Sequence, residues 1–316
     1  MQTILPRVRL VLGLAAVCVL GLSTIAEAAE ASAPPKNRVP GASVTASAWP
    51  GGTMLAPGKW AISDHVGFAH GELRKGGGSH TNRNARGEAV GQDDNDRLTN
   101  TFKIRYGLAD GWDVRLSVPF VNNDIHRHSP QDDTWKGGFN DMTLMLRRRV
   151  VGLAPGQPFA VAVDVGTVIP AGEVGANNVG TGAWGLVFGG GASWIDCNQR
   201  VDVDARYVTY TQRGARRTTP AGYFQSHAHY AYALTDWVDA GLETNIRVSG
   251  ESEVGNTGQD DEYTEWYGGP KLQFHVRDWG LSFGTAALLP IYRHYESPKG
   301  RLSDDVRYEF RVGMVF

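Results

Sequence analysis

Charged side chains recur at every second position in several segments of this sequence. Asp202, Asp204 and Arg206, for example, alternate with the apolar residues Val201 and Val203. In an extended strand, alternate side chains lie on opposite faces, so these charges would share one face. Such a face could line a hydrated passage and set its selectivity. The candidates for this role are Lys103, Arg105, Arg115, Arg147, Asp164, Asp202, Asp204, Arg206, Glu243, Arg247, Lys271, Arg307, Glu309 and Arg311.

The run Ser226-His227-Ala228-His229 offers a second kind of chemistry, with one hydroxyl and two imidazoles. A serine hydrolase needs its nucleophile within hydrogen-bond reach of a base, and a third group to orient that base. Ser226 and His227 are adjacent, so in a strand they would point to opposite faces. The chain has no nucleophile motif, and we expect no enzyme activity and no cofactor. His227 and His229 would share a face, but no further metal ligands are readable beside them.

The last segment shows which element positions the charges. In residues 305–316, the apolar side chains are two apart and end on Phe316, while Arg307, Glu309 and Arg311 fill the gaps. This alternation predicts a strand with one apolar and one charged face. In a chain with a secretory signal, lipid outside and water inside fit these faces better than a soluble core. A terminal aromatic on such a strand resembles the signal that the barrel-assembly machinery reads.

The same pattern recurs along the chain and predicts an all-β transmembrane antiparallel up-and-down barrel of about twelve strands. Connections alternate between short turns and long polar loops, which places both termini on the periplasmic side and the long loops outside. The strands are expected near residues 59–70, 97–109, 111–121, 140–151, 158–169, 182–195, 200–211, 222–234, 237–248, 262–276, 280–292 and 304–316.

A barrel of this strand count encloses only a modest pore. The inward charges therefore have a second interpretation, in which they pair across strands and fill a narrow lumen. The sequence leaves both interpretations open.

Five tryptophans support the strand register, because all of them fall at the expected periplasmic ends of strands. Aromatic residues gather at membrane interfaces in barrels of this kind. The membrane-interface candidates are Trp60, Trp112, Trp194, Trp237 and Trp279.

The N-terminus carries the features of a secretory signal peptide over residues 1–28. Arg7 and Arg9 precede an apolar stretch, and Ala26-Glu27-Ala28 fits a cleavage site near Ala28. Residues 29–58 are rich in Ala, Pro, Gly and Ser, which predicts a flexible periplasmic segment before the barrel at 59–316. The formal net charge of −2 gives no basic surface for nucleic acid.

Four stretches resemble a known family, the outer-membrane barrels named for the meta-pathway of phenol degradation. They are YGLADGWDVRLSVPFV at 106–121, GGFNDMTLMLRRRV at 137–150, IPAGEVGANNVGTGAWGLVFGGG at 169–191 and the terminal aromatic strand. The family pattern more often has glycine where this chain has Asn140. The resemblance implies a transporter or channel, with a weak link to aromatic-compound degradation and no catalytic residues to carry over.

We therefore expect a porin-like channel in the outer membrane of a Gram-negative bacterium, passing small compounds, including aromatic or hydrophobic ones, down a gradient. Its expected partners are outer-membrane lipid and lipopolysaccharide, the barrel-assembly machinery and a small-molecule permeant. The alternatives are a phospholipase-like outer-membrane hydrolase and a closed structural barrel. Residues 29–58 could also plug the lumen from below.

Overall fold

The computed structural model describes residues 39–73, 93–126, 134–152, 158–174, 179–296 and 302–316. The predicted signal peptide at 1–28 lies outside these ranges, as do residues 29–38 and parts of the expected long loops. Within the described ranges, no helix has the length and apolar character needed to cross a membrane.

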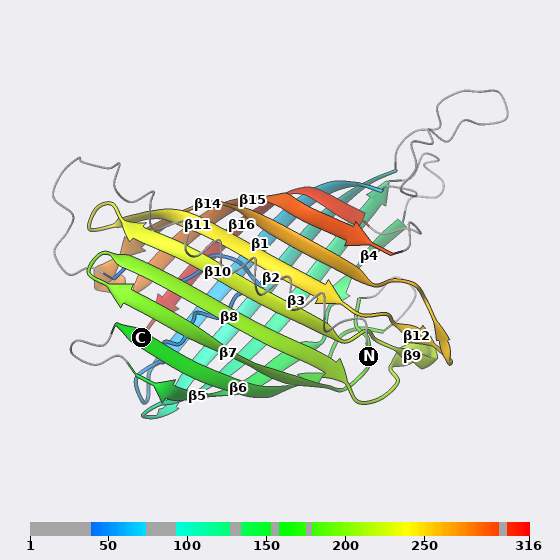
Figure 1. Cartoon of the computed structure of the whole chain (residues 1–316), viewed down its shortest axis with the longest axis horizontal. Helices are drawn as coiled ribbons and strands as arrows, with labels where there is room; N and C mark the ends of the chain where they lie inside the picture. The colour runs from blue at the N-terminus through cyan, green and yellow to red at the C-terminus, as the bar shows by residue number, and fades with distance from the viewer. Residues whose placement is uncertain (1–38, 74–92, 127–133, 153–157, 175–178, 297–301) are drawn as a thin grey trace.

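Twelve strand positions form one closed antiparallel β-barrel, as the sequence predicts (Figure 1). We call each position a stave, because β4 and β5 together fill one of them. Consecutive staves are neighbours, and β1 and β16 close the ring through an antiparallel ladder with one register shift, between His70 and Gly71. The staves are β1 (Trp60–Leu73), β2 (Asp93–Ala109), β3 (Trp112–His126), β4 (Thr134–Phe139) with β5 (Met142–Val151), β6 (Phe159–Ile169), β7 (Gly185–Asp196), β8 (Gln199–Tyr210), β10 (Tyr223–Ala233), β11 (Val238–Ser249), β14 (Tyr263–Val276), β15 (Leu281–Tyr295) and β16 (Leu302–Val315).

One stave is interrupted, and the sequence did not predict its outer half. Strand β4 occupies residues expected to belong to a loop, and it is separated from β5 by Asn140 and Asp141. The Asp141 carboxylate accepts hydrogen bonds from the backbone N–H groups of Gly172, at 3.2 Å, and Thr181, at 2.9 Å. The strand therefore breaks where a side chain fastens the connection between β6 and β7.

The two ends of the barrel differ in their connections. We call the end with the short connections, such as those from β2 to β3 and from β7 to β8, the turn end. The opposite end, the loop end, also carries a small sheet of β9 (Thr218–Thr219), β12 (Glu253–Val254) and β13 (Thr257–Gly258), and a 3-10 turn, η4 (Ala215–Arg217). A second 3-10 turn, η5 (Arg277–Trp279), joins β14 to β15 at the turn end.

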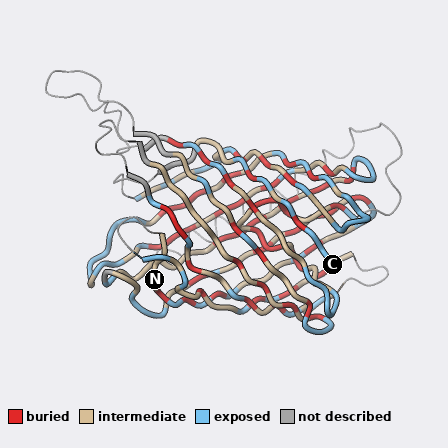
Figure 2. The backbone as a smooth tube through the Cα atoms, turned by 180° about the vertical axis from the view of Figure 1, so that it is seen from behind, coloured by how far each residue is buried: buried red, intermediate tan, exposed pale blue. Residues whose placement is uncertain are grey.

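Burial is inverted relative to a soluble protein. Along β16, Tyr308 and Phe310 are exposed, while the intervening Glu309 is buried. Buried and less buried residues alternate along much of the barrel wall (Figure 2). An apolar outer face is stable only against lipid, because water would have to solvate a continuous apolar belt.

The sequence predicts a flexible segment over residues 29–58 that could plug the lumen, and in the structure residues 39–58 lie inside the barrel. These residues, the lumen segment, enter the barrel from the turn end and contact its inner wall. Val44, Ala48 and Trp49 are buried there. The glycines allow this close approach, because a Cβ on Gly52 would lie 2.1 Å from the carbonyl oxygen of Ala160. The small residues of this segment therefore allow tight packing against the wall, whereas from sequence they were interpreted as a sign of flexibility.

Two apolar clusters anchor the lumen segment. Trp49 packs against Met145, Val168, Val187 and Val208 of the wall. Val44 packs with Tyr267, Ala286 and Leu288 on the opposite side. Full burial of side chains of this size contributes about 1.5–3 kcal/mol each, so the segment is held by apolar contact as well as by charge.

Candidate functional site

The lumen segment has no regular secondary structure, so its backbone groups need partners in the barrel wall. Three predicted cations supply donors for its carbonyls. Lys103 Nζ donates to the carbonyl of Ala48 at 2.6 Å, and Arg147 donates to that of Gly51. Arg105 donates to the carbonyl of Thr53 at 3.1 Å.

Carboxylates of the wall accept the N–H groups of the same segment. Glu243 accepts from Val44 N and Thr45 N, each at 3.2 Å, and from the hydroxyl of Ser43. Asp204 accepts from Trp49 N at 3.0 Å. The wall thus presents both signs of charge to a peptide that offers both donors and acceptors.

The charges also pair with each other across the staves. Asp113 lies between Arg105, at 2.9 Å, and Arg115, at 2.8 Å. Arg147 and Asp164 form a pair with two hydrogen bonds. Buried charges are costly unless they are paired, so these contacts are needed before any charge can face the lumen.

Asp202 belongs to another such group at the turn end. It accepts from Arg200 at 2.8 Å and from the hydroxyl of Ser193, and His229 lies 3.4 Å away. The like charges on Asp202 and Asp204 therefore have separate partners.

The remaining predicted charges lie on the inner face as well. Arg311 donates to the carbonyl of Ser43 at 2.9 Å, and Lys271 to that of Ala42 at 3.4 Å.

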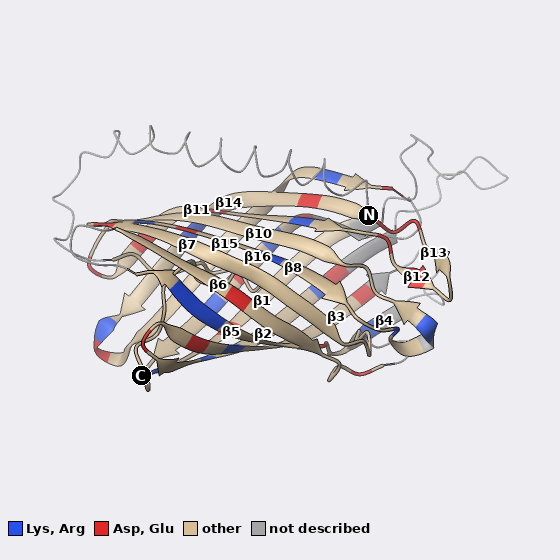
Figure 3. Cartoon of the chain, turned by 60° about the horizontal axis from the view of Figure 1, so that its bottom comes forward, with Lys and Arg blue, Asp and Glu red and all other residues tan. Residues whose placement is uncertain are grey.

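Other predicted charges contact side chains of the wall. Arg247 stacks over Tyr223 at 4.0 Å from the ring centroid. Arg307 stacks over Tyr267 at 3.6 Å, pairing with Glu265 at 2.9 Å. Arg206 donates to Gln225 at 2.8 Å, and Glu309 is buried. The positions of acidic and basic residues on the strands are shown in Figure 3.

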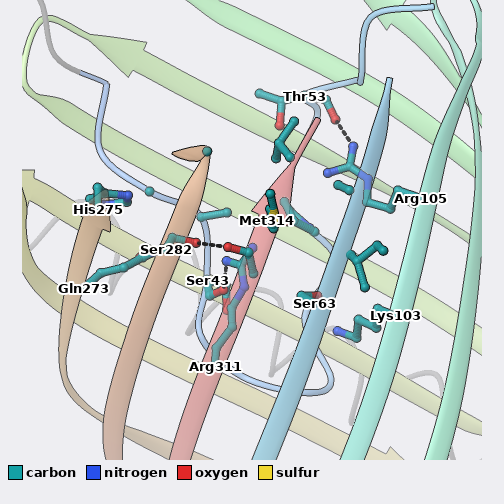
Figure 4. A pocket seen from close by; sticks show the side chains of 18 of the residues that line it. Ser43, Thr53, Ser63, Lys103, Arg105, Gln273, His275, Ser282, Arg311 and Met314 are labelled. Carbon is teal, nitrogen blue, oxygen red and sulfur yellow. Dashed lines mark hydrogen bonds between the residues drawn. The ribbon is translucent and has the colours of Figure 1, made fainter. Parts of the chain in front are cut away.

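A cavity of about 580 Å³ lies beside the lumen segment (Figure 4). Its walls come from the lumen segment and from β1, β2, β8, β14, β15 and β16. Lys103, Arg105 and Arg311 supply cations, while Trp49 and Met54 supply apolar surface. The volume falls within the range of about 300–1,000 Å³ that is common for small-molecule sites.

The serine and histidines at 226–229 do not form a site together. Ser226 donates to the backbone carbonyl of Asp204 at 3.0 Å, whereas His227 and His229 are buried on the inner face. In the part of the chain that the structure describes, no group of three or more His, Cys, Asp or Glu residues is placed to hold a metal ion.

The five predicted interface tryptophans all lie at the turn end. Trp60 begins β1 and Trp112 begins β3, while Trp194 lies near the end of β7. Trp237 and Trp279 lie in connections and are strongly exposed, with 57% and 69% of their surface accessible. Phe316 exchanges two backbone hydrogen bonds with Trp60, at 2.9 and 3.0 Å, so the last residue extends the β1–β16 ladder.

Several residues that hold the lumen segment were not among the sequence candidates. Arg200 donates to the carbonyl of Pro40 at 3.3 Å, and Asp239 accepts from Gly41 N at 2.7 Å. His65 donates to the carbonyl of Val44 at 3.1 Å. The alternation rule places all three on the inner face, but it gives no reason to expect a peptide there. The apolar residues Val44 and Trp49, isolated in a polar and small-residue stretch, were the sequence signal that could have indicated burial of this segment.

Comparison with protein families agrees with this architecture. Residues 73–289 match the family model described as "Putative MetA-pathway of phenol degradation", which covers more than half of the chain. The chain belongs to this family. Comparison with curated proteins finds no match.

Among solved structures, an outer membrane channel shares the fold, and other barrels resemble the chain less. The COG4313 outer membrane channel from Pseudomonas putida F1 has a TM-score of 0.66 at 13% identity, over 83% of this chain and 97% of that one. The translocator domain of the autotransporter NalP from Neisseria meningitidis has a TM-score of 0.43 at 11% identity, over 83% and 89% of the chains. The CymD monoaromatic hydrocarbon channel has a TM-score of 0.36 at 9% identity, over 83% and 88%.

Proposed function

We propose that this family member is a passive outer-membrane channel for small compounds, including aromatic or hydrophobic ones, and that the lumen segment narrows its passage. The turn end would face the periplasm, and the signal peptide would be removed near Ala28. The proposal rests on one observation, which is the contact between the lumen segment and the polar inner wall. Side-chain hydrogen bonds and small apolar clusters hold the segment, without a strand ladder.

The cavity beside the segment supports the choice of permeant. It combines apolar surface from Trp49 and Met54 with the cations Lys103 and Arg105. An aromatic ring can pack against the apolar part and interact with a cation through its π face. A phenol or benzoate would fit this chemistry better than a sugar.

Ionic conductance of the refolded chain in planar lipid bilayers tests the proposal. A variant that lacks residues 29–56 should give larger conductance steps than the chain that begins at residue 29, because the lumen would lose its obstruction. A variant that lacks only residues 29–38 is the matched control and should resemble the parent.

The permeant class is tested on the same channels. Benzoate or phenol should reduce the residual current of the parent at lower concentration than a sugar of similar size. Equal currents with and without residues 39–56, from protein shown to be folded, would contradict the obstruction. Current block by the sugar at equal concentration would contradict the aromatic preference.

A further inference from the structure

Three side chains from separate parts of the chain form a hydrogen-bonded series inside the lumen. The Oγ of Ser47, in the lumen segment, lies 2.7 Å from Nε2 of His227 on β10. The Nδ1 of His227 lies 3.0 Å from Oδ1 of Asp204 on β8. A hydroxyl, an imidazole and a carboxylate in this order are the arrangement that activates a serine nucleophile.

The hydrogen-bond network fixes the tautomer of His227. Arg206 can only donate, so the Gln225 oxygen that it contacts at 2.8 Å is the acceptor. The Gln225 amide nitrogen then lies 3.3 Å from His227 Nε2 and donates to it. Nε2 therefore carries no proton, and Nδ1 donates to Asp204. This is the tautomer in which Nε2 can accept a proton from Ser47.

The carboxylate is held in place from its other side. Asp204 Oδ2 accepts the N–H of Trp49 at 3.0 Å, so the carboxylate that orients the imidazole also binds the peptide that carries the serine. Asp204 and His227 face each other in the β8–β10 ladder, and both are buried. Such an environment strengthens the interaction between the imidazole and the carboxylate.

The surroundings of Ser47 combine partial accessibility, aromatic side chains and an arginine with a buried Nε. Ser47 keeps part of its surface accessible, unlike its two partners. Trp49 lies two residues away, and the wall around its ring includes Tyr210 and Tyr223. The Nε of Arg206 is buried without a hydrogen-bond partner among the described residues, and its guanidinium lies 5.9 Å from the Trp49 ring. An unpartnered cationic donor can stabilise an oxyanion.

We propose that Ser47 and His227 are catalytic residues that hydrolyse small carboxylic esters bearing an apolar or aromatic group, with Asp204 and Gln225 as positioning residues. Ser47 Oγ attacks the ester carbonyl while its proton moves to His227 Nε2, and the negative oxygen faces Arg206. The C–O bond to the alcohol then breaks, and His227 gives its proton to the leaving alcohol. Water, deprotonated by His227, then attacks the acyl carbonyl. The C–O bond to Ser47 Oγ breaks, and His227 returns the proton to Ser47 Oγ, which releases the carboxylic acid and restores Ser47.

This activity goes beyond passage through the barrel and is separable from it. The site is complete only while the lumen segment is in place, because Ser47 belongs to that segment. Displacing the segment should therefore raise conductance and abolish ester hydrolysis together. Loss of the Ser47 hydroxyl alone should abolish hydrolysis, whatever its effect on conductance.

Active-site labelling with an alkyl fluorophosphonate tests the proposal on the refolded chain. Ser47 Oγ would form a bond to phosphorus, fluoride would leave and His227 would take the proton. We expect mass spectrometry to place the label on Ser47 in folded protein and to find none after denaturation. Turnover of p-nitrophenyl acetate should be lost with Ser47→Ala. Ser252→Ala should keep the parent rate, because the Ser252 hydroxyl lies in an exposed hydrogen bond to Asp261, its only hydrogen-bond partner among the described residues.

His227 and the positioning residue Asp204 are tested by substitutions that keep the shape of the site. His227→Gln should lower the labelling rate by about 10²–10⁴-fold, which is the usual contribution of a general base. Asp204→Asn should also lower it, and Asp204→Glu should restore part of the rate. Each variant is compared only after heat-modifiable gel mobility shows a folded barrel.

Labelling that persists in folded Ser47→Ala, or that proceeds at the parent rate in folded His227→Gln, would overturn the proposal, as would the absence of any label on folded parent. The three side chains would then serve only to fasten the lumen segment. The conductance experiments above do not depend on this result.

Discussion

Arg147 and Asp164 face each other across the β5–β6 ladder, and their side chains form an ion pair with two hydrogen bonds inside the lumen. The same guanidinium donates to the carbonyl of Gly51 in the lumen segment. One side chain therefore joins two staves and the peptide that crosses the barrel.

Replacing Arg147 with Met should destabilise the barrel and loosen the lumen segment. Asp164 would be left as a buried charge without its partner, which costs about 3–5 kcal/mol. We expect a lower urea midpoint of unfolding in lipid and more frequent large conductance steps. The double variant Arg147→Met with Asp164→Leu should recover most of the stability but not the parent conductance. An unchanged midpoint in the single variant would show that water already screens the pair.

Gly191→Leu should displace the lumen segment without disturbing the outer face. A Cβ on Gly191 would lie 2.4 Å from the carbonyl oxygen of Gly51, so a larger side chain cannot coexist with the segment in its present position. We expect larger conductance and faster proteolysis within residues 39–58. Ala192→Leu is the control, because Ala192 is exposed on the opposite face of the same strand. If both variants have the same conductance, the contact between Gly191 and Gly51 does not determine the width of the passage.

Removing Phe316 should lower the amount of folded barrel in the outer membrane. The deletion takes away both an aromatic terminus and two hydrogen bonds to Trp60. Phe316→Ala keeps the hydrogen bonds and removes only the ring, so it separates an assembly signal from ladder stability. We expect both variants to assemble poorly in cells, as measured by the heat-modifiable fraction. Normal assembly of Phe316→Ala would assign the effect to the ladder.

The sequence by itself determined the barrel. Alternation along segments such as 305–316 set the strand period, and a period of two assigns every side chain to the lipid or the lumen face. The alternation of short and long connections predicted the up-and-down topology. The same alternation placed the five tryptophans at the strand ends that carry the short connections. These features are local, because they depend on neighbours within one strand or one turn.

Only the tertiary structure decided what fills the lumen. Residues 39–58 carry no alternation, so their sequence gave no periodic signal of a partner. Their position depends on contacts between residues far apart in the chain, such as Ser47 with His227 and Val44 with Glu243. The inner charges could be placed on a face from sequence, but their partners could not. A charge pairs with whichever donor or acceptor the closed barrel brings within reach.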